Sequence, residues 1–237
     1  MVCTDRGIVE STVIVKLSDA ASGTPVFVHL DAHCLVVEKP SGLLCVPGRG
    51  ADKQDCLASR VQALVPDALV VHRLDMATSG LWLMARGADM QRRLSRAFAE
   101  REVTKRYVAV VAGRLEPPAD AVGGWGTIDL PLAADWPNRP RRVVDAQAGK
   151  PSITRWRVLG HDTAGDTTRV ELAPVTGRSH QLRVHLQALG HPILGDTLYA
   201  PAGVQARAPR LLLHATGLRI AHPAGAGSME WSSPPPF

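Results

Sequence analysis

The chain has 237 residues and a mass of 25.3 kDa, enough for one large domain or two small ones with a buried core. Its composition, 45% hydrophobic and 21% charged, excludes a disordered chain, a collagen-like fibre and a coiled coil as descriptions of the whole protein. The 27 basic and 22 acidic residues give a net charge of +5, which weakly favours a polyanionic partner.

The sequence carries no signal for a membrane or for a metal. No stretch approaches the roughly 18 apolar residues of a membrane span, and the N-terminus has no basic segment followed by a long apolar run. The four cysteines include no Cys-x-x-Cys pair, and His33 beside Cys34 has no partner at zinc-finger spacing. We therefore expect a cytoplasmic protein with free thiols, no membrane contact and no metal ligands.

The predicted elements of the first half are short strands and loops, followed by one clear helix. Residues 1–29 are expected to form a loosely organised extension. A buried strand over 35–37 ends at a turn signature over 39–42; a short helix over 57–64, a turn over 72–80 and an apolar strand over 81–85 follow. Met90, Leu94 and Phe98 recur at helical spacing and predict an amphipathic helix, which precedes a buried strand over 107–112.

The second half adds strands over 153–158 and 169–172 and one further helix. Ser179 is positioned to cap this helix, which carries Leu182 and Leu186 and ends at Gly190. Residues 225–237 are predicted to be a C-terminal tail, frayed from residue 232 onward. Because strands and helices do not alternate regularly, the expected class is α+β, with a mixed, mostly antiparallel sheet and flanking helices.

Two segments are locally basic. Residues 86–106 hold seven basic side chains against three acidic ones, and residues 135–157 hold six against two, so each has an excess of +4. Charge alone leaves open whether these segments are solvated surface or bind a polyanion.

The reactive side chains gather in two clusters. Residues 71–80, Val-His-Arg-Leu-Asp-Met-Ala-Thr-Ser-Gly, place Asp75 in a turn, where a carboxylate more commonly satisfies backbone N–H groups than reacts. Residues 176–185 crowd Arg178, His180, Arg183 and His185 at a helix start, which alone could be an anion site or a capping arrangement.

Taken in order, these clusters resemble the RluA family of RNA pseudouridine synthases. The resemblance runs from about residue 30 to 222 and includes Lys-Arg-Tyr-Val-Ala (105–109), Gly-His-Pro-Ile-Leu-Gly-Asp (190–196), Glu-Lys-Pro-Ser-Gly-Leu (38–43), Asp-Trp-Pro-Asn-Arg-Pro (135–140) and Leu-Leu-Leu-His-Ala (211–215). It implies a pseudouridine synthase fold with a central catalytic cleft over residues 30–224.

Segments 71–80 and 135–140 are similar to the RluA subgroup, whose members modify a tRNA anticodon loop and 23S rRNA. The thirty residues before the first motif are too few for the S4 RNA-binding domain of many relatives. The Gly-rich stretch over 113–129 departs from the closest pattern and leaves RNA selection open.

The resemblance also implies site residues. Asp75 matches the catalytic carboxylate, which attacks ribose C1′ or removes a C2′ proton; Arg183 is its expected charge partner, and Tyr107 matches the aromatic residue of the active site. Arg73 resembles the arginine that fills the gap left by the flipped base. The RNA contacts are expected from Arg73, His72, Arg139, Arg141, Arg142, Arg178 and His180.

The chemistry constrains the alternatives. Pseudouridylation is an isomerisation without net redox change, so the resemblance implies no cofactor and no metal. A noncatalytic RNA-binding protein on the same scaffold remains the alternative, although retention of Asp75, Tyr107 and Arg183 together counts against it. A metal-dependent hydrolase is disfavoured because no residues have metal-ligand spacing. A shallow basic cleft fits a monomer.

Overall fold

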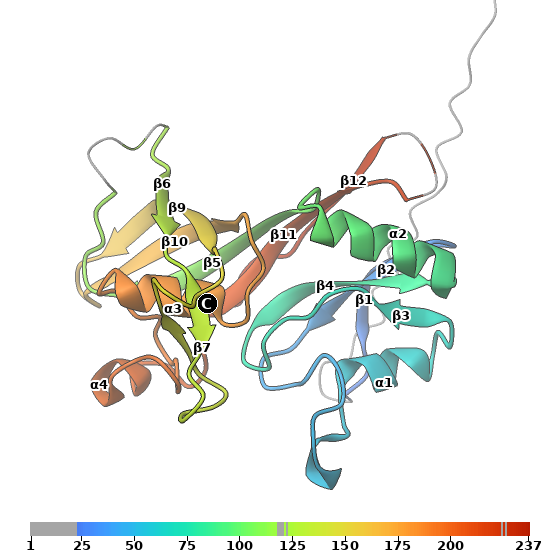
Figure 1. Cartoon of the computed structure of the whole chain (residues 1–237), viewed down its shortest axis with the longest axis horizontal. Coiled ribbons are helices and arrows are strands. Elements are labelled where there is room, and N and C mark those ends of the chain that lie inside the picture. The colour runs from blue at the N-terminus through green and yellow to red at the C-terminus, as the bar shows by residue number, and fades with distance from the viewer. Residues whose placement is uncertain (1–22, 118–120, 122, 224, 226) are drawn as a thin grey trace, which may run out of the picture.

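The computed structural model describes residues 23–117, 121, 123–223, 225 and 227–237. One ten-stranded sheet runs through the molecule in the order β1-β2-β4-β11-β5-β10-β9-β6, with β3 also pairing β4 and β12 also pairing β11. Every pairing is antiparallel except β4 with β11. With a few helices packed on this mixed, mostly antiparallel sheet, the predicted α+β class is confirmed (Figure 1).

The first half of the chain builds one end of this sheet. Its strands are β1 (Val26–Leu30), β2 (Cys34–Lys39), β3 (Ala68–Val70) and β4 (Ser79–Arg86), and its helices are η1 (Ala51–Lys53), α1 (Leu57–Gln62) and α2 (Gly87–Ala99). Side chains alternate between the two faces of a strand. Leu35 and Trp82 therefore pack beneath α1, whereas Val36 and Leu83 pack beneath α2 on the opposite face (Figure 1).

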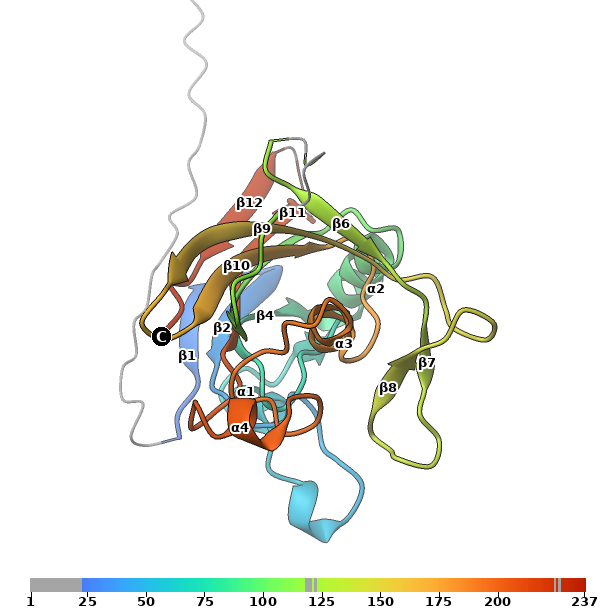
Figure 2. The ribbon, with the colours of Figure 1, turned by 90° about the vertical axis from the view of Figure 1, so that its left-hand side faces the viewer.

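The second half builds the other end. Its strands are β5 (Thr104–Ala112), β6 (Gly126–Asp129), β9 (Ile153–Asp162) and β10 (Thr167–Pro174), with helices α3 (Gln181–Ala188) and α4 (Ala202–Gln205). Leu182 and Leu186 of α3 pack against Trp156, Val170 and Leu172 on one face of the sheet. A separate hairpin of β7 (Leu132–Ala134) and β8 (Arg142–Val144) projects beside α3 (Figure 2).

Strand β11 (Leu213–Ala221) joins the two halves, because it pairs with β4 on one side and β5 on the other. β12 (Ser228–Ser232) pairs along its outer part. Gly80 has φ +109, and a Cβ there would collide with the backbone of Ala215, so only glycine permits the parallel β4–β11 contact. That contact fixes where β4 starts, directly after the loop that carries Asp75.

The start of α3 differs from the prediction. Ser179 is exposed and does not cap the helix; the N-cap residue is His180, with a left-handed φ of 58 and no side-chain capping bond. The side chain of Gln181 instead holds the loop before the helix, since its Oε1 accepts from the Arg178 N–H at 3.0 Å and from the Thr176 hydroxyl at 2.7 Å. The predicted Ser179 cap is therefore wrong.

The predicted fraying of residues 232–237 is also wrong. The Phe237 carbonyl accepts a hydrogen bond from Arg169 at 2.6 Å, and its ring lies 5.5 Å from the Arg210 guanidinium carbon. The Ser233 N–H donates to the Thr216 carbonyl at 2.8 Å, which extends the β11–β12 contact. Partners distant in sequence thus hold this segment.

At the other end, residues 1–22 of the expected extension lie outside the described residues, and its last residues enter β1. Cys34, Cys45 and Cys56 are buried free thiols, as predicted, whereas Cys3 lies outside the described part. Within the described residues, no helix has both the length and the apolar character needed to cross a bilayer.

Candidate active site

Asp75 lies in the loop between β3 and β4, and a buried lysine holds that loop from below. The ammonium of Lys39, at the end of β2, donates to the carbonyls of Pro40 at 2.8 Å, Met76 at 2.9 Å and Thr78 at 2.7 Å. Two of these acceptors, Met76 and Thr78, directly follow Asp75 in the loop. Lys39 is fully buried, whereas the Asp75 side chain is 24% exposed. The hydrogen bonds of Lys39 therefore fix the loop backbone, while the Asp75 carboxylate stays at the surface.

Burial lowers the pKa of Lys39 to about 8, and this effect is partly opposed by Cys45 and Asp75. The ammonium is thus still charged at neutral pH. The sequence analysis placed Lys39 in a turn signature and in the matching segment over 38–43, and it missed this role. A lysine closing a strand whose preceding residues are apolar was the available signal, since such a charge needs buried partners.

Two cationic or polar side chains from α3 approach Asp75 from the other half of the molecule. Arg183 Nη1 lies 3.8 Å from Asp75 Oδ2, and His180 Nε2 lies 3.9 Å from Asp75 Oδ1. Both distances exceed those of a hydrogen bond. Among the described residues, the Asp75 carboxylate accepts no hydrogen bond. Its oxygens therefore face the positive charge of Arg183 without a hydrogen-bond donor on them.

Arg183 is itself held by a second carboxylate. Its Nε and Nη2 donate to the two oxygens of Asp196 at 2.8 and 2.6 Å, and the two side chains are only 4% and 1% exposed. Burial by itself lowers the pKa of Arg183, but the hydrogen bonds and charges of Asp196 and Asp75 outweigh it, so that pKa is raised. A bidentate pair of this kind fixes the orientation of the guanidinium plane.

Tyr199 connects this pair to the β7–β8 hairpin. Its hydroxyl accepts from the Arg142 N–H at 2.8 Å and lies 2.6 Å from His180 Nδ1, while its ring lies 5.0 Å from the Arg183 guanidinium carbon. Because the hydroxyl accepts from Arg142, its own proton can point to Nδ1, which leaves the ring proton of a neutral His180 on Nε2, toward Asp75. Burial lowers the pKa of His180 and favours that neutral form. Sequence reasoning did not identify Tyr199.

Tyr107 lies on β5, paired with Leu172 of β10 and Ala215 of β11. Burial raises the pKa of its hydroxyl, and the negative charge of Asp75 adds to that shift. The hydroxyl is therefore protonated at neutral pH. Of the residues that the resemblance implied for catalysis, Arg183 thus lies 3.8 Å from Asp75, and Tyr107 is close enough for the Asp75 charge to act on its hydroxyl.

The predicted RNA-contacting residues have varied surroundings. Arg73 is exposed in the Asp75 loop, and Arg178 is exposed before α3. Arg139 and Arg141 lie in the turn of the β7–β8 hairpin, and Arg142 opens β8. The Nε atoms of Arg142 and Arg210 are buried and have no hydrogen-bond partner among the described residues.

His72 has a different environment. Its Nε2 accepts from the Leu83 N–H at 3.1 Å, and its ring stacks on Phe98 with centroids 4.4 Å apart. Burial lowers its pKa to about 3. These contacts are those of a neutral histidine that packs α2 against β4.

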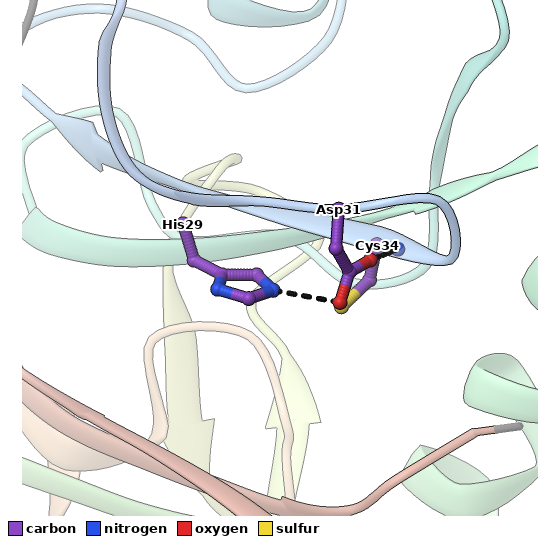
Figure 3. Close-up of side chains that lie close together, drawn as sticks. All are labelled: His29, Asp31 and Cys34. Atoms are coloured by element: carbon purple, nitrogen blue, oxygen red, sulfur yellow. Dashed lines mark hydrogen bonds and ion pairs between the residues drawn. The ribbon is translucent and has the colours of Figure 1, made fainter. Parts of the chain in front are cut away.

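One cluster outside this site has metal-ligand atoms close together: His29, Asp31 and Cys34, whose ligand atoms lie within 4.8 Å of one another (Figure 3). Asp31 already accepts from the N–H groups of His33 and Cys34 at 2.7 and 2.8 Å and lies 2.9 Å from His29 Nε2. Burial raises the pKa of the Cys34 thiol to about 12. We therefore assign this cluster to stabilisation of the β1–β2 turn.

Comparisons with known proteins agree with this geometry. The family model described as RNA pseudouridylate synthase matches residues 33–188. The dual-specificity RNA pseudouridine synthase RluA of Escherichia coli (strain K12) is 50% identical over 212 residues, which cover 90% of this chain and 94% of that protein. The protein of the same name from Haemophilus ducreyi (strain 35000HP / ATCC 700724) is 48% identical over 210 residues, covering 89% and 93%.

A solved structure supports the same assignment. Human RNA Pseudouridylate Synthase Domain Containing 1 aligns with a TM-score of 0.74 and 30% identity, over 93% of this chain and 87% of that one. Family model, relatives and fold therefore agree, and the chain belongs to the RNA pseudouridylate synthase family, isomerases that convert uridine in RNA to pseudouridine.

Proposed function

We propose that Asp75 is the catalytic carboxylate. The observation that supports this is its position: partly exposed, 3.8 Å from a buried Arg183, and without a hydrogen bond from any described residue. The fixed guanidinium attracts negative charge at the place where the carboxylate lies. Absence of a hydrogen-bond donor leaves its lone pairs available to the ribose.

The reaction breaks the bond between ribose C1′ and uracil N1, turns the base and joins C1′ to C5. Positive charge develops on the sugar when the first bond breaks, and Asp75 either bonds to C1′ or removes the C2′ proton. In either route the C5 hydrogen finally leaves to water, so the atoms balance without an oxidant or an energy source. The Tyr107 ring is suited to stack against the uracil, and its hydroxyl, protonated at neutral pH, is suited to assist that proton movement.

The substrate we propose is a structured RNA with an unpaired loop, a tRNA anticodon stem-loop and a 23S rRNA hairpin. The resemblance of segments 71–80 and 135–140 and the "dual-specificity" name of the 50%-identical relative support this choice. Arg73, exposed in the Asp75 loop, is suited to fill the gap left by the flipped base. Phosphate contacts come from Arg139, Arg141, Arg142 and Arg178, with His180 beside the target; we assign His72 a structural role.

We further propose that the protein acts as a cytoplasmic monomer. A single chain contains Asp75 and all the residues proposed above for catalysis and RNA contact, as a monomeric enzyme requires. Sedimentation with and without RNA tests this, and a dimer at working concentration would contradict it.

The deciding experiment follows tritium from uracil C5 into water with anticodon stem-loop and 23S hairpin transcripts, in the presence of EDTA. We expect release by the parent protein, none by Asp75→Asn, and unchanged release by Asp89→Asn, a matched change of an exposed carboxylate on α2. RNA affinity should be equal in all three. Substantial release by Asp75→Asn would remove Asp75 as the catalytic group, and tight binding without release by the parent would favour the noncatalytic alternative.

A further inference from the structure

The tip of the β7–β8 hairpin exposes a large aromatic side chain. Trp136 is 69% exposed, and the guanidinium carbon of Arg139 lies 3.6 Å from the centroid of its ring. A guanidinium stacked on one face of an indole orients the ring and leaves the other face to solvent. Exposing so much apolar surface needs a reason beyond folding, because burying the ring would stabilise the chain.

The backbone of this tip is held in place. The Asp135 carboxylate accepts from the side-chain amide of Asn138 at 3.0 and 3.1 Å, and the Asp135 N–H donates to the Arg141 carbonyl at 3.1 Å. Pro137 fixes one more backbone torsion of the turn. The ring is therefore presented in one orientation, which lowers the entropy lost when a ligand stacks on it.

A continuous set of contacts joins the tip to Asp75. Ala134, two residues before Trp136, pairs with Arg142, and the Arg142 N–H donates to the Tyr199 hydroxyl at 2.8 Å. Tyr199 contacts His180, which faces Asp75. Trp136 lies two residues beyond the end of β7, so the ring joins the site through this chain of contacts and is separated from Asp75 by several side chains. A ligand that reached both would be extended and negatively charged, given Arg139, Arg141 and Arg142 alongside.

A second tryptophan supplies the contrast. Trp125 is partly buried, and the guanidiniums of Arg106, Arg155 and Arg157 lie 4.9 to 5.2 Å from its ring. Trp156 packs beneath α3, so its neighbours Arg155 and Arg157 point to the opposite face of the sheet. The second basic segment therefore divides: residues 139–142 lie on the Asp75 side, and residues 155 and 157 on the reverse face.

We propose that Trp136 is a stacking platform for an unpaired base of the RNA loop, a base other than the target uridine. Aromatic rings beside arginines bind single-stranded bases in this way, since every base has a face that stacks. Trp136 then helps select loops over duplexes and sets how the loop enters the site. This inference rests on the proposed RNA substrate.

The test measures binding in an Asp75→Asn background, so that no product forms. Anticodon stem-loops carry 2-aminopurine at each unpaired position in turn, and fluorescence is followed during titration. We expect the Asp75→Asn parent to quench the fluorescence of 2-aminopurine at one loop position. The added Trp136→Ala change should abolish this quenching and raise the Kd about tenfold. The Kd of Trp136→Phe should stay within about threefold of the parent Kd. The Kd of the control Trp125→Ala should equal the parent Kd.

With Asp75 restored, Trp136→Ala should raise KM by a similar factor and leave kcat nearly unchanged. Equal Kd values for the parent and Trp136→Ala, or equal weakening by Trp125→Ala, would overturn the inference. Failure of the proposed function has a different result: the protein with Asp75 intact would release no tritium, whatever the 2-aminopurine titration shows. Thermal unfolding of each variant identifies any that fail to fold.

Discussion

Asp75 is approached by a buried cation from each half of the molecule, and the two cations are held differently. Lys39 binds only backbone carbonyls, two of them in the Asp75 loop, at 2.7 and 2.9 Å. Arg183 binds a carboxylate, Asp196, through two hydrogen bonds. Lys39 therefore determines where the loop lies, and Arg183 determines the charge that faces it. Separate groups perform these tasks, so the Asp75 carboxylate need not stabilise its own loop.

The largest effect is expected on the arginine side. Asp196→Asn leaves Arg183 buried without its counter-charge, which should lower the free energy of unfolding by about 3 kcal/mol or more. Freed from its anchor, the guanidinium also loses its alignment with Asp75, and conversion should fall on the order of 100-fold. Urea denaturation and single-turnover assays measure both. Near-parental conversion in a folded Asp196→Asn protein would show that Arg183 needs no anchor.

A change at Lys39 should act on the site through the position of the Asp75 loop. Lys39→Met removes three hydrogen bonds and leaves buried carbonyls unsatisfied, which should cost about 3 kcal/mol of stability. Combined with Asp196→Asn, the losses in stability should add within about 0.5 kcal/mol if the two sides are independent. A larger deviation in the double-mutant cycle would mean that the two cations act as one network, contrary to the division of tasks described above.

Acid should destabilise the contact between β4 and β11 that lies next to the Asp75 loop. Ser79, the first residue of β4, lies 2.8 Å from His214 Nδ1, and burial lowers the pKa of His214 to about 4. An unfolded histidine has a pKa near 6.5, so the unfolded chain binds the proton first as pH falls. The contribution of neutral His214 to the free energy of unfolding is therefore fully present above pH 6.5, and it declines by about 3 kcal/mol as pH falls toward 4. His214→Gln should flatten this part of the pH profile, and an unchanged slope would assign the acid loss to other histidines such as His72.

The smallest change concerns the hairpin that Tyr199 ties to the arginine side. Replacing Arg141 and Arg142 together by Gln keeps the backbone N–H that Tyr199 accepts, so the fold should be unaffected. If both side chains neutralise phosphates, the slope of log K against log salt should fall by up to about two. The slope is measured by titration at several salt concentrations. A parental slope would place both arginines off the RNA path.

Local patterns predicted the elements well. The apolar residues of β2 and β4, the helical spacing of Met90, Leu94 and Phe98, and the motif around Asp75 all gave the correct element or cluster. These signals are local, because periodicity reports one buried face. Tyr199 and the partners of Lys39 were missed because their contacts join residues far apart in the sequence.

Structure that composition does not encode explains the two wrong predictions. Ser179 is a good capping residue, but α3 begins one residue later than a Ser179 cap requires, after His180 in a left-handed conformation. The proline-rich tail has the composition of a frayed end, but Arg169 and Arg210 hold Phe237. Composition describes what a segment prefers in isolation and says nothing of a partner supplied by another strand.

Ala215 pairs with Gly80 on one side and with Tyr107 on the other. The strand that brings the two halves of the site together is therefore made after both of them, during N-to-C synthesis on the ribosome. Until β11 emerges, no strand pairing among the described residues links β4, which follows the Asp75 loop, to β5, which carries Tyr107. Assembly of the active site is thus a late event in biosynthesis, and a nascent chain interrupted before residue 213 would contain every proposed catalytic side chain without the strand that unites them.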